Sequence, residues 1–219
     1  MSINVEMYQQ IKQELAAKQV TLVAVSKTKP VADIEVLYAL GQRDFGENYV
    51  QELVDKQAQL PPDIHWHFIG HLQSNKVKYI APFVHLIHGV DSLKLLKEID
   101  KQAVKNNRII HCLLQVHIAS EETKFGMDEN ELTEAIQQLN LFPNVKVCGL
   151  MGMASFSDDE NKLRTEFNTL HTLLQKSAIS HQPSAILSMG MSGDYKMAIE
   201  EGSTMVRIGS LLFGARVYQ

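Results

Sequence analysis

Short apolar or β-branched runs recur along the chain, and longer polar segments separate them. Eight such runs are present, at residues 21–27, 44–48, 65–70, 84–90, 109–118, 145–153, 184–190 and 204–210. Runs of this length between polar segments are typical of buried strands in a parallel sheet. The pattern therefore predicts eight β-strands.

The segments between the runs have the spacing of amphipathic helices, with apolar residues three or four positions apart. Examples are Ile34, Leu37 and Tyr38; Val50, Leu53 and Val54; Leu93, Leu96 and Ile99; Leu132, Ala135, Ile136 and Leu139; and Leu163, Phe167, Leu170 and Leu174. Two segments also begin with helix-start signals, which are Asp91 with Ser92 and the acids of "FSDDENKL". Each predicted helix can cover a sheet with one face and meet water with the other.

Eight strands that alternate with helices predict a single α/β domain over residues 1–219, a (β/α)8 TIM-type barrel. An open doubly wound sheet is the alternative, since a longer segment separates the sixth and seventh runs. We find no internal repeat, low-complexity tract or Pro/Gly-rich linker that suggests a second domain.

Composition narrows the function. The chain has 219 residues, 45% of them hydrophobic, and a net charge of −4 with its nine histidines neutral. Without a positive field, nucleic acid and anionic membrane surfaces are poor partners, so small-molecule chemistry is favoured. The N-terminal residues lack the apolar core of a signal peptide, and no window resembles a membrane span, so we expect a soluble, cytoplasmic protein. Cys112 and Cys148 lie in apolar runs, which predicts two reduced core thiols.

A lysine stands where the first strand ends, in "TLVAVSKTKP". Lys27 shares strand parity with Val23 and Val25, whereas Lys29 directly precedes Pro30 and is expected in a turn. Barrel enzymes carry their functional groups at the carboxyl ends of strands, so Lys27 is a candidate site residue. On this stretch alone, a rim lysine that reaches solvent is the favoured interpretation.

The last two runs both continue through glycine and serine into a helical segment. Ser192 and Gly193 follow the seventh run, and Gly209 and Ser210 end the eighth. Glycine lets backbone amides approach an anion, and a helix N-terminus favours negative charge, so the pair resembles two halves of a phosphate cup. The same residues could be turn formers and helix caps.

Arg207 lies on the same face of the last strand as Gly209. A guanidinium inside the barrel mouth needs a partner, which could be a core acid or a ligand. A strand-end lysine, a phosphate cup and a nearby arginine together suit pyridoxal 5′-phosphate (PLP), whose aldehyde, phosphate and ring nitrogen they could meet.

Six motifs, in this order along the chain, resemble those of a known family: "VAVSKTKP", "FGENYVQE", "WHFIGHLQSNK", "GLMGM", "LSMGMSGDYKMAI" and "VRIGSLLFGAR". The sequence resembles the pyridoxal phosphate homeostasis proteins (the YggS/PROSC family) over nearly its whole length. The resemblance implies the fold of the alanine racemase N-terminal domain, with Lys27 as the Schiff base lysine and Asn48 near the ring's carbonyl side. It further implies a phosphate site of Ser192, Gly193, Gly209 and Ser210, with Arg207 approaching the ring nitrogen.

The histidines near the third strand are not assigned to chemistry. His71 stands where many relatives of the family have proline, so no role is inferred for it. His65 and His67 alternate along a strand of which one side must face inward. We interpret them as packed or hydrogen-bonded histidines and predict no metal site, because no matching acid cluster appears.

Two functions remain open. An arginine at the ring nitrogen would keep that nitrogen unprotonated and weaken the ring as an electron sink, which favours holding the cofactor over turnover. We also expect no second catalytic base, since the sequence stops soon after the eighth strand. The chain is therefore expected to be a monomeric PLP carrier that serves vitamin B6 homeostasis or delivery to PLP-requiring apoenzymes. The alternative is an amino-acid racemase or decarboxylase with Lys27 as its base.

Overall fold

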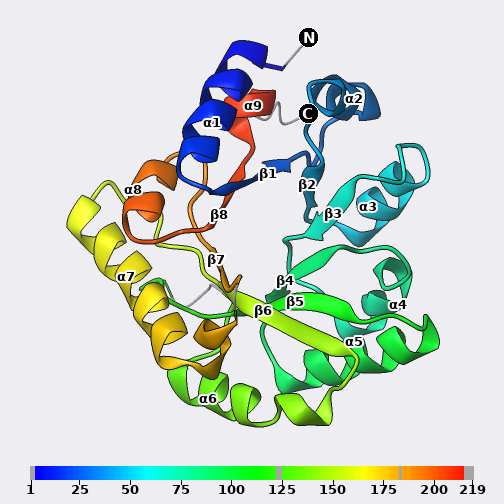
Figure 1. The fold of residues 1–219 in the computed structure, drawn as a ribbon, viewed down its shortest axis with the longest axis vertical. Helices are drawn as coiled ribbons and strands as arrows, with labels where there is room; N and C mark the ends of the chain where they lie inside the picture. Colours follow the sequence, from blue (N-terminus) through cyan, green and yellow to red (C-terminus); the bar gives the residue numbers. More distant parts are fainter. Residues whose placement is uncertain (1–2, 122–124, 183, 215–219) are drawn as a thin grey trace.

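The fold is a closed barrel of eight parallel strands with helices outside it (Figure 1). The computed structural model describes residues 3–121, 125–182 and 184–214. The strands follow chain order, and β8 pairs with β1 through four residues, including Arg207 beside Val23. This closure confirms the predicted barrel and excludes the open sheet, which would have two unpaired edges. The strands are β1 (Thr21–Val25), β2 (Asp44–Glu47), β3 (His65–Phe68), β4 (Leu86–Val90), β5 (Ile110–Gln115), β6 (Val145–Met151), β7 (Ile186–Ser188) and β8 (Met205–Ile208).

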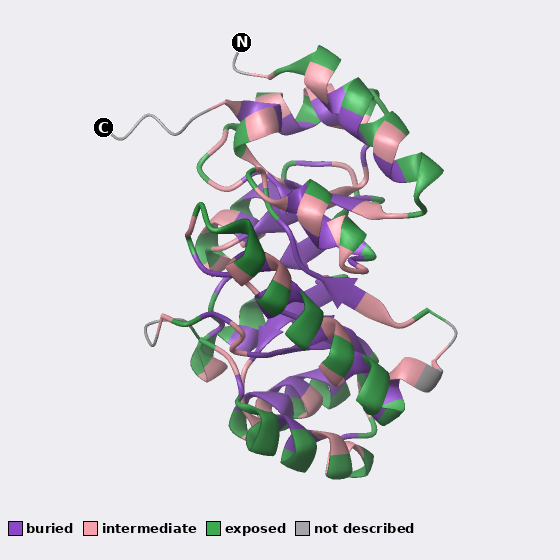
Figure 2. Ribbon diagram, turned by 90° about the vertical axis from the view of Figure 1, so that its left-hand side faces the viewer, coloured by how far each residue is buried: buried purple, intermediate pink, exposed green. Residues whose placement is uncertain are grey.

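Helices cover the outside of the barrel, with buried inner faces and exposed outer faces (Figure 2). The α-helices are α1 (Val5–Ala17), α2 (Val31–Ala39), α3 (Val50–Gln57), α4 (Val77–Ile80), α5 (Leu93–Lys105), α6 (Glu129–Gln137), α7 (Glu160–Lys176), α8 (Tyr195–Glu200) and α9 (Ser210–Phe213). Three short 3-10 helices accompany them, η1 (Ser74–Lys76), η2 (Leu139–Leu141) and η3 (Ala178–His181). None of the helices in the described ranges is long and apolar enough to cross a bilayer.

Each predicted strand is present but shorter than its apolar run, because the ends of the runs turn into loops. Lys27, for example, lies two residues beyond the end of β1. The helix-start signals are confirmed, since the side chains of Ser92 and Asp159 accept hydrogen bonds from backbone amides at the start of α5 and α7. Helix α1 lies outside the predicted pattern, and Asn4 caps it.

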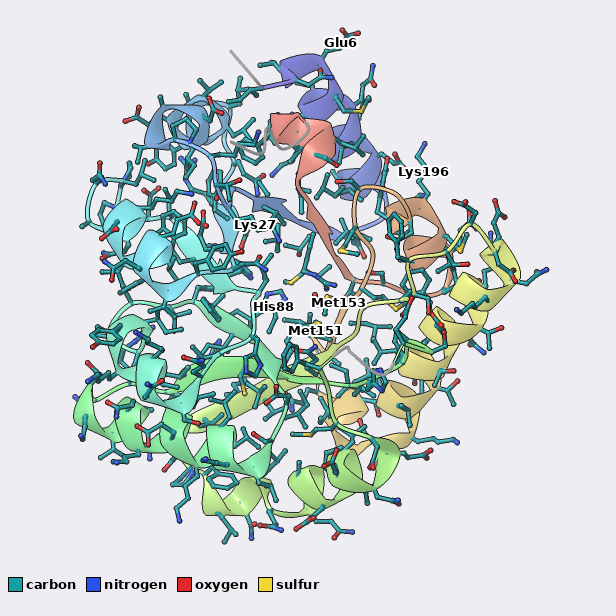
Figure 3. All side chains as sticks on the ribbon, turned by 180° about the vertical axis from the view of Figure 1, so that it is seen from behind. Glu6, Lys27, His88, Met151, Met153 and Lys196 are labelled. Atoms are coloured by element: carbon teal, nitrogen blue, oxygen red, sulfur yellow. The ribbon has the colours of Figure 1, made fainter. Side chains whose placement is uncertain are left out.

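Two apolar cores lie on the two sides of the sheet. The larger fills the space between strands and helices, and the smaller lies inside the barrel, where Figure 3 shows Met151 and Met153 beside His88. The barrel interior also holds buried polar groups from four strands, namely His67, His88, Ser188 and Arg207. Cys112 and Cys148 are both buried and form no disulfide, as the sequence predicts. Buried polar side chains in an apolar interior are tolerated when their polar atoms are fully hydrogen-bonded.

Candidate functional site: a cationic cavity at the carboxyl ends of the strands

A cavity of about 390 Å³ lies at the end of the barrel where the strands finish, here called the C-terminal mouth. All seven residues singled out from the sequence line it: Lys27, Asn48, Ser192, Gly193, Arg207, Gly209 and Ser210. Their positions along the chain are far apart, and the loops after β1, β2, β7 and β8 bring them together. Apolar walls complete the cavity, including Met153, Phe156 and Met191. Its size is within the range of small-molecule sites.

The loop that carries Lys27 is fixed at each side of the lysine. The Ser26 amide donates to the Gly46 carbonyl at 3.0 Å, and the Lys29 amide donates to the Ser26 carbonyl at 3.0 Å. Between them, Thr28 has a φ of 64°, an unfavourable conformation for a β-branched residue. The Thr28 amide donates to the Glu52 carboxylate at 2.6 Å, which helps to hold this conformation. Strain of this kind is characteristic of functional loops.

A buried ion network supports the same loop, and sequence reasoning missed it. The Lys56 amine donates to carboxylate oxygens of Glu47 at 2.8 Å and Glu52 at 2.7 Å, and to the Ser26 carbonyl at 2.8 Å. The Ser26 hydroxyl also donates to Glu47 at 2.6 Å. Burial raises the pKa of Glu47 to about 7, although Lys56 and Ser26 act to lower it. The spacing of Glu52 and Lys56 on one face of α3 was the available signal.

The two predicted halves of the phosphate cup contact each other. The Gly209 amide donates to the Ser192 hydroxyl at 3.2 Å, which ties the loop after β7 to the loop after β8. Both loops lead into short helices, α8 and α9, and neither helix has a side-chain cap at its start. Uncapped first-turn amides favour an anion, so the arrangement is consistent with the predicted cup.

Two further details suit a ligand in this mouth. A Cβ placed on Gly193 would meet no atom within 4 Å, so packing within the protein does not explain this glycine. The Lys29 amine, in contrast, donates to the Phe213 carbonyl at 2.6 Å and fastens the β1 loop to α9. Lys29 thus joins two elements of the fold.

Arg207 is buried, with 4% of its surface exposed, and its guanidinium has neutral partners. It donates to the Ser188 carbonyl at 2.9 Å, the Ser188 hydroxyl at 2.6 Å and the Gly152 carbonyl at 3.0 Å. The alternative of a hydrogen-bonded core acid is thus wrong. Burial lowers the pKa of Arg207 to about 10, which leaves it charged at neutral pH. These three hydrogen bonds hold the guanidinium in place, and Arg207 also lines the cavity.

Asn48 offers the clearest sign that the cavity is shaped for a ligand. Its side-chain Oδ1 atom is buried and has no hydrogen-bond partner. A buried acceptor without a donor costs about 1–3 kcal/mol, so such an atom in a cavity indicates a donor on the ligand. Gly70 supports the position, because a Cβ there would lie 2.2 Å from the Asn48 carbonyl oxygen. Sequence reasoning did not anticipate the role of Gly70.

The histidines singled out from the sequence, His65, His67 and His71, do not line this cavity. His71 lies next to Asp91, with 3.2 Å between Nδ1 and Oδ2, and its ring stacks on Phe125. His65 and His67 both hydrogen-bond to Asp44, at 3.2 and 2.9 Å, which confirms that they are hydrogen-bonded histidines. The sequence argument found no matching acid cluster near them and did not connect them with Asp44, the one acid that both contact.

The chain is similar to known proteins over most of its length. The family model described as "Alanine racemase, N-terminal domain" matches residues 6–217. The pyridoxal phosphate homeostasis protein of Aquifex aeolicus is 44% identical over 204 residues, which cover 90% of this chain and 87% of that protein. The chain belongs to the pyridoxal phosphate homeostasis family.

Solved structures of this family have the same barrel. PipY of Synechococcus elongatus without PLP has a TM-score of 0.88 and 37% sequence identity, and the match covers 95% of this chain and 99% of that one. The structure of PipY with PLP bound has a TM-score of 0.86 and 36% identity, with the same coverage. The family assignment thus rests on sequence and on fold together.

Proposed function

We propose that this chain binds PLP in the cavity of the C-terminal mouth, as a Schiff base with Lys27, and contributes to vitamin B6 homeostasis or cofactor delivery. The observation that carries the proposal is the convergence of Lys27, Asn48, Arg207 and the two serine-glycine loops on one cavity. Relatives named pyridoxal phosphate homeostasis proteins, and PipY with PLP bound, support it.

The residues present fit the cofactor. Three cationic side chains line the cavity, and its described lining contains no carboxylate, so a phosphate monoester is favoured there. The orphaned acceptor of Asn48 matches a ligand donor, and the uncapped starts of α8 and α9 match an anion. PLP would supply an aldehyde that condenses with an amine, with loss of water, and a ring that withdraws electrons from what it holds.

The protein's own groups favour retention. Lys27 presents an amine from a loop that two hydrogen bonds and the Glu47–Lys56–Glu52 network hold in place. Arg207 faces the cavity as a permanent cation and can donate hydrogen bonds but cannot deliver a carboxyl-type proton. A ring nitrogen opposite Arg207 would therefore stay unprotonated.

The lining also bears on turnover. Among the described residues around the cavity, the side chains that could act as bases are Lys27 and Lys29, and Lys29 is hydrogen-bonded to Phe213. Racemisation needs a base on each face of the bound substrate, which this lining does not offer. This arrangement supports a binding protein over the racemase alternative.

The test uses the two neighbouring lysines as a matched pair. Protein loaded with one equivalent of PLP is reduced with borohydride, and the labelled peptide is mapped. We expect the pyridoxyl group on Lys27, no visible-absorbing adduct in Lys27→Ala, and an adduct retained in Lys29→Ala. Labelling of another lysine in the stoichiometrically loaded protein would show that the proposal is wrong. Saturable, Lys27-dependent turnover of an amino acid would instead establish the enzymatic alternative.

A further inference from the structure

A second cluster of functional side chains lies at the opposite end of the barrel, where the strands begin, here called the N-terminal mouth. Asp44 begins β2, His65 begins β3, and His85 directly precedes β4. His67 lies two residues after His65 in β3, and 1% of its surface is exposed. We define Asp44, His65, His67 and His85 as the histidine cluster. None of these residues belongs to the cavity that holds Lys27.

The geometry of this cluster points to a metal site. We propose that Asp44, His67 and His85 bind a divalent transition-metal ion of the Zn²⁺ class at the N-terminal mouth. One potential ligand atom from each residue lies within 4.8 Å of the others. Three adjacent strands supply the three ligands, so the barrel itself sets their separation. Two imidazoles and one carboxylate form a donor set that suits zinc, and solvent can fill the remaining position.

His67 has the support that metal-binding histidines usually have. Its Nε2 atom lies 2.9 Å from Asp44, on the side of the proposed metal, while its Nδ1 atom lies 2.9 Å from Nε2 of His88. His88 is fully buried, and its Nδ1 atom lies 3.1 Å from the Ser188 hydroxyl. The ring of His67 is thus fixed by a buried partner, and its outer nitrogen is directed at the cluster.

The exposed side chains of His65 and His85 leave the proposed metal site accessible from solvent. His85 is exposed, and its ring stacks on that of the exposed His65 with 4.4 Å between centroids. Tetrahedral zinc holds its ligand atoms roughly 3.4 Å apart, so the three donors must draw together by a small movement. The exposed His85 side chain can make that movement, whereas buried His67 and the strand-bound Asp44 form the fixed part of the site.

Metal binding would also change the hydrogen bonds behind the cluster. Arg207 can only donate and the Asp44 carboxylate can only accept, so rings that each carry one N–H donate in one direction, from Ser188 through His88 and His67 to Asp44. A metal on Nε2 of His67 requires the N–H of that ring to lie on Nδ1, and the bond to His88 is then reversed. The N–H of each ring then lies on Nδ1 in place of Nε2.

The experiment uses the untagged full chain, stripped of metal with a chelator. Zn²⁺ is titrated by calorimetry, Co²⁺ serves as the spectroscopic probe, and Mg²⁺ is the negative control. We expect about one Zn²⁺ or Co²⁺ per chain, visible Co²⁺ bands of low coordination number, and no Mg²⁺ binding. Asp44→Asn and His85→Ala should each weaken Zn²⁺ binding by at least about tenfold.

His71→Ala is the matched control, because His71 is also a partly exposed histidine paired with an aspartate, but it follows the end of β3. Thermal unfolding without metal shows that each variant is folded. Nitrogen NMR of the imidazoles adds a structural readout, since zinc should convert His67 and His88 to their Nδ1–H forms. Absence of stoichiometric Zn²⁺ binding, or equal binding by wild type and His85→Ala, would overturn the proposal.

Discussion

The two mouths of one barrel carry different chemical groups, and these groups come from different strands. At the C-terminal mouth, Lys27 and Lys29 on the loop after β1 and Arg207 near the end of β8 line a cavity. At the N-terminal mouth, Asp44, His65 and His85 lie at or next to the first residues of strands, and His67 is the third residue of β3. One end is therefore suited to an anion and the other to a cation. Loops can vary the first site easily, whereas the barrel register fixes the second.

Strand β2 shows the contrast within four residues. Its first residue, Asp44, has a lowered pKa because the hydrogen bonds from histidines outweigh burial. Its last residue, Glu47, has a pKa raised to about 7 because burial outweighs Lys56. One carboxyl group faces a partly open mouth, and the other is sealed beneath the Lys27 loop. The same chemical group thus has opposite behaviour at the two ends of one strand.

The largest effect is expected at Arg207, where the hydrogen bonds from the two mouths meet. Arg207→Gln removes donors from the buried Ser188 and Gly152 acceptors, which should lower the free energy of unfolding by about 2–4 kcal/mol. Urea unfolding measures this loss. Arg164→Gln is the control, since it removes exposed ion pairs to Glu200 and Glu201 and should cost much less. Equal losses would mean that Arg207 does not connect the two regions.

The next effect concerns the pH dependence of stability at Glu47. Its folded pKa of about 7 lies above the ordinary value of 4.5, so between these values the unfolded chain releases a proton that the folded chain keeps. The contribution of Glu47 to the free energy of unfolding is therefore fully present below about pH 4.5. It is lost as the pH rises to about 7, and the loss is up to a few kcal/mol. Glu47→Gln should flatten this part of the profile. A wild-type profile that rises across this range would contradict the prediction.

A smaller effect should separate phosphate binding from the rest of the cofactor site. Ser192→Ala and Ser210→Ala each remove a hydroxyl at the cup, and a hydrogen bond to a charged group contributes about 1.5–3 kcal/mol. We expect PLP to bind at least roughly tenfold more weakly to each variant. Pyridoxal, which lacks the phosphate, is the control ligand and should bind wild type and variants alike. Equal wild-type affinity for PLP and pyridoxal would exclude the cup.

The smallest effect is expected at Gly193. A Cβ there meets nothing in the protein within 4 Å, so Gly193→Ala should leave stability unchanged or raise it by up to about 1 kcal/mol. If the backbone of Gly193 approaches the ligand, the same change should weaken PLP binding. The site is supported if the variant is at least as stable as wild type in thermal unfolding but binds PLP more weakly in a titration. Unchanged PLP affinity would place Gly193 outside it.

The sequence by itself predicted the barrel and seven of the residues that line the C-terminal cavity. Apolar runs mark parallel strands that are buried on both faces, and strand-end loops meet at one mouth whatever the details of packing. Lys27, Ser192 and Arg207 could therefore be brought together from their positions alone. Their roles toward a ligand were carried by motifs, which the chain shares with its family.

Only the tertiary structure decided which groups lie next to these residues. The partners of Arg207 are carbonyls of distant strands, and the support of Lys27 comes from Glu47 and Lys56, whose contacts depend on how α3 packs. His67 and His85 become neighbours of Asp44 because β2, β3 and β4 pair in one register. No local pattern encodes that register, since a one-residue shift would turn each side chain to the other face of the sheet.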